Sequence, residues 1–114
     1  MPIVSPADRD SFEQNGYVVI RGLLTPGELA RFGGAVDRGV ERRTAGDTRA
    51  FAERSAYEQS FLQCINLWED CEDVRPLSFH QGIGGAAAAL LGVPAIRIWH
   101  DQALYKEAGV RGTD

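Results

Sequence analysis

The sequence predicts a small α+β domain, because segments with helix signals alternate with segments of strand formers along its 114 residues. Capping residues flank the stretches with helical spacing, and runs of β-branched and aromatic residues lie between those stretches. The predicted order is helix, strand, long helix, strand, helix, strand. Residues 1–114 are therefore expected to form a single domain, and the polar surface loop predicted at residues 43–50 does not separate two domains.

The first predicted helix begins at Ser5 and ends at Gly16. Ser5 can act as the N-cap, and Pro6 occupies the first helical position, where its missing N–H costs nothing. Asp8 completes a capping box with Ser5. Gly16 is typical of a left-handed C-cap, so the helix is expected to stop there.

The second predicted helix begins at Thr25, where the letters TPGE repeat the same start signal. Its apolar residues recur at three- and four-residue steps on one face: Leu29, Phe32, Val36 and Val40. A single helical turn broken by Pro76 is expected within residues 74–80, and a third helix within residues 84–91. Gly92 provides the usual helix stop.

Three segments predict strands, at residues 17–20, 60–68 and 95–105. The first is a β-branched run, the second alternates imperfectly between apolar and polar residues, and the third is long. Residues 106–114 contain glycine and are expected to form a loop.

Polar residues interrupt two of these predicted strands: Gln63, Asn66 and Gln102. Strand alternation places Gln102 on the same face as His100 and puts Asp101 on the opposite face. A buried amide without a partner costs about 1 to 3 kcal/mol. Each amide therefore implies either a hydrogen-bond partner within the protein or a bound ligand, and the sequence leaves both alternatives open.

The charge balance argues against nucleic acid as a partner, because 16 acidic residues outnumber 12 basic ones and no basic cluster is present. No apolar run approaches the roughly 20 residues that cross a bilayer, and the N-terminal residues do not have the plan of a signal peptide. We therefore expect no membrane partner and a cytoplasmic protein. Cys64 and Cys71 fit neither a disulfide framework nor a zinc pair, so reduced, inert thiols are expected.

Metal binding by the chain itself has little support, because His80 and His100 are its only histidines. An iron site with two histidines and one carboxylate usually opens with His-x-Asp or His-x-Glu, and neither histidine is followed by that pattern. His100 is expected to be a hydrogen-bonded strand residue and His80 a surface residue at a helix end. No metal ligand and no catalytic residue is predicted.

A dinucleotide-binding domain is one alternative, because the letters GIGGAA at residues 82–87 loosely match the glycine-rich fingerprint and open a helix. Asp101 follows at the spacing expected of the acidic residue that binds ribose. That fingerprint requires a buried strand directly before it, whereas residues 75–81 are largely polar and contain Pro76. The conformation of residues 75–81 therefore tests this alternative.

Four segments of the chain follow one another in a recognisable order. They are FEQNGYVVIRGLL at residues 12–24, NLWE at 66–69, ALLG at 89–92 and IRIWHDQALYK at 96–106. Together they resemble the N-terminal part of the phytanoyl-CoA dioxygenase (PhyH) family, whose members are non-haem Fe(II)- and 2-oxoglutarate-dependent oxygenases. The resemblance extends over nearly the whole chain.

The resemblance implies a double-stranded β-helix, a cupin-like jelly roll with outer helices. The family's iron ligands, a His-x-Asp motif and a distant histidine, are absent from the sequence. We therefore expect residues 1–114 to be one partial domain, the N-terminal helices and first strands of an incomplete barrel. A complete member uses Fe(II) and 2-oxoglutarate to hydroxylate a small molecule. The present chain alone is expected to bind neither tightly and to be inactive.

The resemblance also implies which residues contact the co-substrate. Gln102 occupies a strand position that contacts 2-oxoglutarate in relatives, and Gln63, or alternatively Asn66, lies near a second such position on another strand. Lys106 corresponds to a lysine at the end of the strand that carries Gln102, where we expect a structural or gating role. His100 is not assigned as an iron ligand.

A further alternative is a non-catalytic remnant or interaction module. In that case an unpaired sheet edge and an uncovered apolar face are completed by self-association or by another chain. A monomer that melts cooperatively would argue against it.

Overall fold

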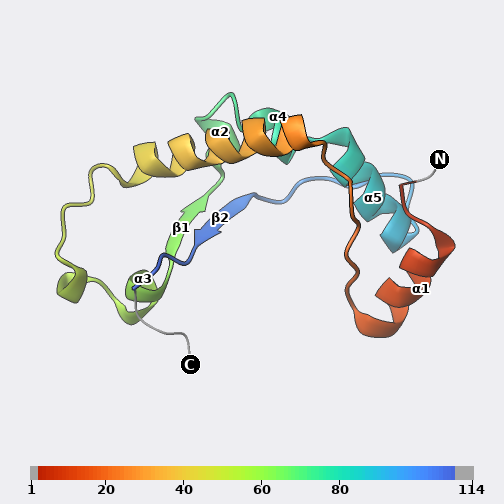
Figure 1. The fold of residues 1–114 in the computed structure, drawn as a ribbon, viewed down its shortest axis with the longest axis horizontal. Helices are drawn as coiled ribbons and strands as arrows, with labels where there is room; N and C mark the ends of the chain where they lie inside the picture. The colour runs from red at the N-terminus through yellow and green to blue at the C-terminus, as the bar shows by residue number, and fades with distance from the viewer. Residues whose placement is uncertain (1–2, 110–114) are drawn as a thin grey trace.

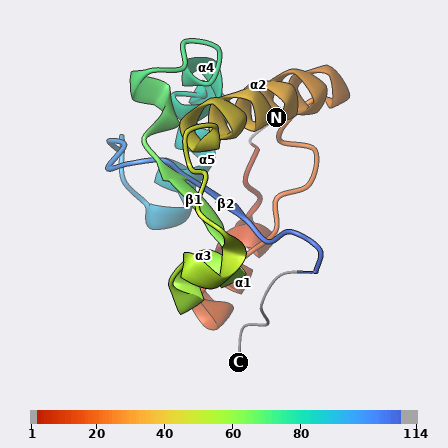
Figure 2. The same cartoon turned by 90° about the vertical axis from the view of Figure 1, so that its left-hand side faces the viewer.

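Helix α2 (Pro26–Thr44) spans one side of the molecule, and a two-stranded sheet lies beneath it (Figure 1). The computed structural model describes residues 3–109. Helices α1 (Pro6–Asn15) and α5 (Gln81–Leu91) contact each other at the opposite end of the molecule. Figure 2 shows the sheet running from beneath α2 toward the short helix α3 (Ala56–Ser60).

The predicted ends of the first two helices are largely confirmed. Ser5 caps α1 in a capping box with Asp8, and Gly16 closes the helix in the left-handed region at φ 79°. Thr25 and Glu28 form the same box at the start of α2. These ends depend on residues only a few positions apart, which explains why the sequence predicts them well.

The buried face of α2 carries small residues as well as large ones: Phe32, Ala35, Gly39 and Val40. Leu29, which the spacing places on this face, is 57% exposed. Gly39 allows the helix to approach its neighbours closely, since a Cβ there would lie 3.1 Å from the Sγ of Cys71. The apolar spacing alone missed the contribution of Ala35 and Gly39 because neither side chain is large.

Strands β1 (Leu62–Ile65) and β2 (Gln102–Tyr105) pair in an antiparallel register. Leu62 opposes Tyr105 and Cys64 opposes Ala103, and this face of the sheet packs against the core. The core consists of buried side chains from α2, β1 and the segment that follows β1: Ala35, Val40, Cys64, Leu67, Cys71 and Val74. Helix α2 therefore covers one face of the sheet.

The strand predicted at residues 17–20 is wrong. These residues belong to no helix or strand and pair with no other described segment, and Tyr17 and Val19 are 68% and 64% exposed. β-branched residues favour an extended backbone, but a strand also needs a neighbour that accepts its hydrogen bonds.

The strand predicted at residues 60–68 is reduced to β1. Its first residue belongs to α3, a helix missed in the sequence although Ser55 and Glu58 form a capping box at its start. At the other end Asn66 adopts the left-handed conformation, φ 57° and ψ 49°, and the 3₁₀ helix η2 (Leu67–Glu69) follows. Two local helix signals therefore shorten the strand from both sides.

The strand predicted at residues 95–105 is correct only for β2. Residues 95–100 are exposed, and residues 95–101 are not assigned to any helix or strand. β1 pairs only four residues, so it leaves the N-terminal part of the predicted strand without a partner.

Two helix boundaries also differ from the prediction. α2 continues to Thr44, so the loop predicted at residues 43–50 begins later, and it leads into the 3₁₀ helix η1 (Phe51–Glu53). α5 begins at Gln81 rather than Gly84, because the side chain of His80 caps it, and it ends at Gly92 as predicted. Of the loop predicted at residues 106–114, residues 110–114 lie outside the described part of the chain.

The structural context of a dinucleotide fingerprint is absent from the described residues. Residues 75–78 form helix α4 (Arg75–Ser78) rather than a central strand. The two strands found within residues 3–109 are antiparallel, whereas the fingerprint belongs to a parallel βαβ unit. The dinucleotide-binding alternative is therefore rejected.

Among the helices within residues 3–109, none has both the length and the apolar character of a membrane span.

The molecule exposes more surface than a closely packed domain of its size. Its radius of gyration is 16.9 Å, against about 13 Å for a compact domain of this length. Its accessible surface is 8234 Å², against about 6100 Å² for a compact protein of 12.4 kDa. Exposed apolar side chains contribute to the excess, including Leu91, Val93 and Trp99.

Candidate functional site

Gln63 and Gln102 lie on the same exposed face of the sheet. In the observed register Gln63 opposes Leu104 and Gln102 opposes Ile65, so the two glutamines are diagonal neighbours across the strand pair. We call these four residues the amide face. Within residues 3–109 neither glutamine side chain takes part in a hydrogen bond, and Ile65 and Leu104 are about half exposed, at 46% and 48%.

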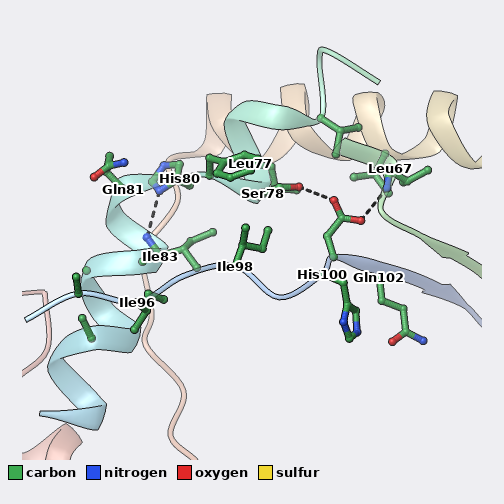
Figure 3. A pocket seen from close by; sticks show the side chains of 18 of the residues that line it. Leu67, Leu77, Ser78, His80, Gln81, Ile83, Ile96, Ile98, His100 and Gln102 are labelled. Atoms are coloured by element: carbon green, nitrogen blue, oxygen red, sulfur yellow. Dashed lines mark hydrogen bonds between the residues drawn. The ribbon is translucent and has the colours of Figure 1, made fainter. Parts of the chain in front are cut away.

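The side chain of His100 lies on the same side of the chain as that of Gln102 (Figure 3). The Asp101 carboxylate instead accepts from the Leu67 N–H and the Ser78 hydroxyl, on the side of η2 and α4. This arrangement confirms the alternation expected for residues 100–102. His100 is exposed rather than held in a strand. The amide face is therefore extended at one end by an imidazole.

Asn66 takes part in the internal structure of the protein. Its Oδ1 accepts a hydrogen bond from the Asp101 N–H at 3.2 Å, and its own N–H donates to the Asp101 carbonyl at 3.0 Å. Of the two alternatives that the sequence left open for Asn66, the internal partner is the one present. Its side-chain oxygen is thus engaged away from the amide face.

Asp101 joins three segments through its carboxylate. Oδ1 accepts from the Leu67 N–H at 2.9 Å, and Oδ2 accepts from the Trp68 N–H at 3.2 Å and the Ser78 hydroxyl at 2.7 Å (Figure 3). The carboxylate therefore caps the start of η2 and holds α4 against β2. This role could not be predicted from the sequence, because the partners lie more than 20 residues away. The only signal was a carboxylate inside an apolar run.

A cleft of about 630 Å³ lies between α4, α5 and the extended chain that leads into β2 (Figure 3). Aliphatic side chains supply most of its lining, among them Val36, Leu77, Ile83, Ile96 and Ile98. Polar groups at its boundary include Ser78, Asp101 and Gln102. Because Ser78 and Asp101 bond to each other, their polar atoms are already partly satisfied within the protein.

His80 links the starts of two helices and is less exposed than predicted, with 17% of its side chain accessible. Its Nδ1 accepts hydrogen bonds from the backbone N–H groups of Gly82 and Ile83 at 3.0 and 3.3 Å. An accepting Nδ1 places the ring proton on Nε2, which donates to Glu28 Oε2 at 2.6 Å. Hydrogen bonds from the Thr25 backbone and from His80 lower the pKa of Glu28. Both ring nitrogens of His80 therefore take part in hydrogen bonds that hold the starts of α2 and α5 together.

The described residues do not fit an iron site. They contain no group of three histidine, cysteine, aspartate or glutamate side chains placed to hold a metal ion. Both ring nitrogens of His80 are engaged, and the carboxylate of Asp101 points away from His100 toward η2 and α4.

Lys106 lies just beyond β2, where its ammonium group donates to the Ser60 carbonyl at 3.3 Å and lies 5.0 Å from the centre of the Phe61 ring. These contacts are compatible with the structural role expected for Lys106. Cys64 and Cys71 are buried free thiols, and burial raises the pKa of both. A raised pKa disfavours the reactive thiolate, as expected for inert cysteines.

Comparison of the sequence with protein-family models and with curated proteins, and of the chain with solved structures, gave no match.

Proposed function

We propose that this chain is the N-terminal scaffold of an Fe(II)/2-oxoglutarate-dependent dioxygenase of the PhyH type, which hydroxylates a small molecule. The amide face would form one wall of its 2-oxoglutarate pocket. One observation carries the proposal: Gln63 and Gln102, the positions singled out by the resemblance, lie diagonally on one exposed face of the sheet.

The arrangement of the sheet supports a place in a jelly roll with outer helices. One face of the strand pair packs against a core that includes α2, and the opposite face carries the glutamines. In such a barrel the face away from the outer helices lines the interior, where ligands bind. A two-stranded sheet is marginally stable on its own, so further strands are expected to complete it.

The amide face is suited to orient a carboxylate but not to bind one tightly. Carboxamide N–H groups can donate to carboxylate oxygens, yet strong carboxylate binding in proteins usually relies on a cation. Lys106, just beyond β2, already donates to the Ser60 carbonyl. The proposal therefore assigns orientation to Gln63 and Gln102. The iron ligands, which the described residues do not supply, come from elsewhere in the complete enzyme.

Titration of the ¹⁵N-labelled chain with 2-oxoglutarate tests the amide face directly. We expect weak binding, with a Kd of about 1 mM or above, and chemical-shift changes centred on the side-chain amides of Gln63 and Gln102. Gln102→Ala should weaken binding further, and Gln14→Ala, an exposed glutamine in α1, should not. Shift changes confined to other residues would contradict the proposal.

Turnover provides a separate test of the scaffold assignment. The chain incubated with Fe(II), ascorbate and 2-oxoglutarate should release no succinate above background, because residues 3–109 do not build an iron site. Succinate release would show that the residues present suffice for catalysis, contrary to the proposal.

The expectation of a cytoplasmic protein is tested by imaging of a fluorescent fusion.

A second candidate is an interaction module completed by self-association or by another protein. The exposed apolar side chains, among them Leu91, Val93 and Trp99, favour it, because apolar surface left exposed by one chain can be covered by another. Sedimentation equilibrium distinguishes this candidate. A concentration-dependent dimer supports it, and a cooperatively melting monomer contradicts self-association.

A further inference from the structure

A second pocket, of about 420 Å³, lies beside α3 and the start of β1. Its walls come from the end of α2, the loop after it, α3 and the first residues of β1, and its charged lining residues are Asp47, Arg49, Arg54, Glu58 and Glu107. We call it the Arg54 pocket. It shares Gln63 with the amide face and has no lining residue in common with the apolar cleft.

Arg49 pairs with two carboxylates of this pocket. Its guanidinium donates to both carboxylate oxygens of Asp47, at 2.9 and 2.8 Å, and also to Glu58. Hydrogen bonds from Arg49 lower the pKa of Asp47, and hydrogen bonds from Arg49 and Ser55 together lower the pKa of Glu58 to about 2. Both carboxylates therefore stay ionised at neutral pH and neutralise Arg49, which leaves no charge on Arg49 for a ligand.

Arg54 differs from Arg49 because its guanidinium has no acceptor among residues 3–109. Its Nε is buried and lacks a hydrogen-bond partner, and no salt bridge of Arg54 is present in the same residues. The backbone on either side is held, since the Arg54 N–H donates to the Phe51 carbonyl and the Arg54 carbonyl accepts from Gln59. A buried, unpaired N–H on a cation is costly, so it points to a missing acceptor.

The remaining walls favour an acceptor with an apolar body. The rings of Tyr57 and Phe61 lie 5.4 Å apart at 42°, and Leu62 lines the pocket next to them. With Asp47, Glu58 and Glu107 negative and Arg49 and Arg54 positive, the charged lining sums to −1. Because the lining is already negative, a phosphate or a dicarboxylate would meet more repulsion than a monocarboxylate, whose single carboxylate is enough to accept from the Arg54 guanidinium.

We propose that the Arg54 pocket binds a small monocarboxylate, whose carboxylate accepts hydrogen bonds from the Arg54 guanidinium and whose apolar body lies against Tyr57, Phe61 and Leu62. The inference does not depend on the proposed oxygenase function, because neither iron nor the amide-face residue Gln102 takes part in it.

Isothermal titration of the whole chain with 3-phenylpropionate at pH 7 tests this site. The neutral amide of the same compound should bind about tenfold more weakly or worse, and so should inorganic phosphate. The acid, its amide and phosphate are all compared on the wild-type chain, so this test remains valid even where a substitution unfolds the protein. Equal affinity for the acid and the amide would overturn the proposal, as would no binding of the acid up to about 10 mM.

Substitutions then locate the site. Arg54→Gln should weaken 3-phenylpropionate binding about tenfold, with Arg54→Lys in between. Arg97→Gln removes the same charge from an exposed position outside the pocket and should leave the affinity unchanged, as should Gln102→Ala. Melting curves of each variant confirm folding. Unchanged affinity in a folded Arg54→Gln variant would assign the acid to another place and overturn the proposal.

Discussion

Two apolar regions of this chain meet different surroundings. In the region where β1 and η2 pack beneath α2, Leu67 and Cys71 are each only 1% exposed. In the extended chain before β2, Trp99 is 90% exposed and Ile96 is 42% exposed. Both regions are rich in apolar residues, but only the first has a helix with small residues against which its side chains pack. Burial here is decided by the facing surface rather than by composition.

Asp101 lies at the boundary between these two regions. Its carboxylate belongs to the packed region through η2 and α4, while its neighbours Trp99 and His100 are exposed. Substitution of Asp101 and substitution of the exposed residue before it should therefore differ sharply in their effect on stability.

The largest effect is expected for Asp101→Ala. It removes the acceptor of the Leu67 and Trp68 N–H groups and of the Ser78 hydroxyl, and should lower the free energy of unfolding by about 3 kcal/mol. Urea denaturation measures it. His100→Ala, one residue away and exposed, is the matched control and should change stability by less than about 0.5 kcal/mol. Equal effects of the two substitutions would refute the distinction.

Helix α2 offers a matched pair of glycines. Gly39→Ala would place a Cβ 3.1 Å from the Cys71 Sγ, so crowding should outweigh the gain in helix propensity and cost about 1 kcal/mol net. Gly33→Ala meets no atom within 4 Å and should stabilise the protein by roughly 0.5 to 1 kcal/mol. Thermal unfolding of both variants shows whether each substitution lowers or raises stability. A stabilising Gly39→Ala would show that the core around Cys71 is packed less tightly than the structure indicates.

Tyr105 should make stability fall at alkaline pH. Burial, together with its hydrogen bond to Asp37, raises the pKa of Tyr105 from 10.0 to about 12. Because the folded pKa lies above the unfolded one, this stabilisation is complete below pH 10 and is lost between pH 10 and about 12.

Tyr105→Phe should remove that part of the alkaline decline, as measured by urea denaturation from pH 8 to 12. Burial also raises the pKa of Cys64 and Cys71, so a decline that begins near pH 9 should persist in the variant. An identical pH dependence in the wild type and in Tyr105→Phe would contradict the assigned shift.

The smallest effects are expected on the amide face. Gln63→Ala and Gln102→Ala remove exposed side chains without hydrogen bonds in the described chain, so each should change stability by less than about 0.5 kcal/mol. Urea denaturation checks this expectation. A loss above 1 kcal/mol from either would place that glutamine in an internal network rather than on a ligand-binding wall.

Helix caps were the most predictable features of this chain. Ser5 with Asp8, and Thr25 with Glu28, are pairs three residues apart, and the structure forms both. The same rule would have found α3 through Ser55 and Glu58. Both partners of such a hydrogen bond lie within a few residues of each other, so it can be predicted without knowledge of the fold.

The candidate site was only partly predictable. Residue alternation anticipated that Gln102 and Asp101 lie on opposite sides, and the polar interruptions drew attention to Gln63 and Asn66. The difference in environment between Gln63 and Asn66 was not predictable from residue type. Asn66 accepts from a backbone N–H of Asp101, 35 residues away, whereas Gln63 opposes Leu104 and its side chain makes no hydrogen bond in the described chain.

The amino-acid sequence by itself determined where helices start and stop and which residues interrupt the apolar runs, because those properties arise within a few residues. Tertiary structure alone decided how long the strands are, which carboxylate joins three segments and that a buried N–H of Arg54 has no acceptor among residues 3–109. Strand pairing, burial and charge neutralisation each require a second segment, and the chain brings that segment into place only when it folds.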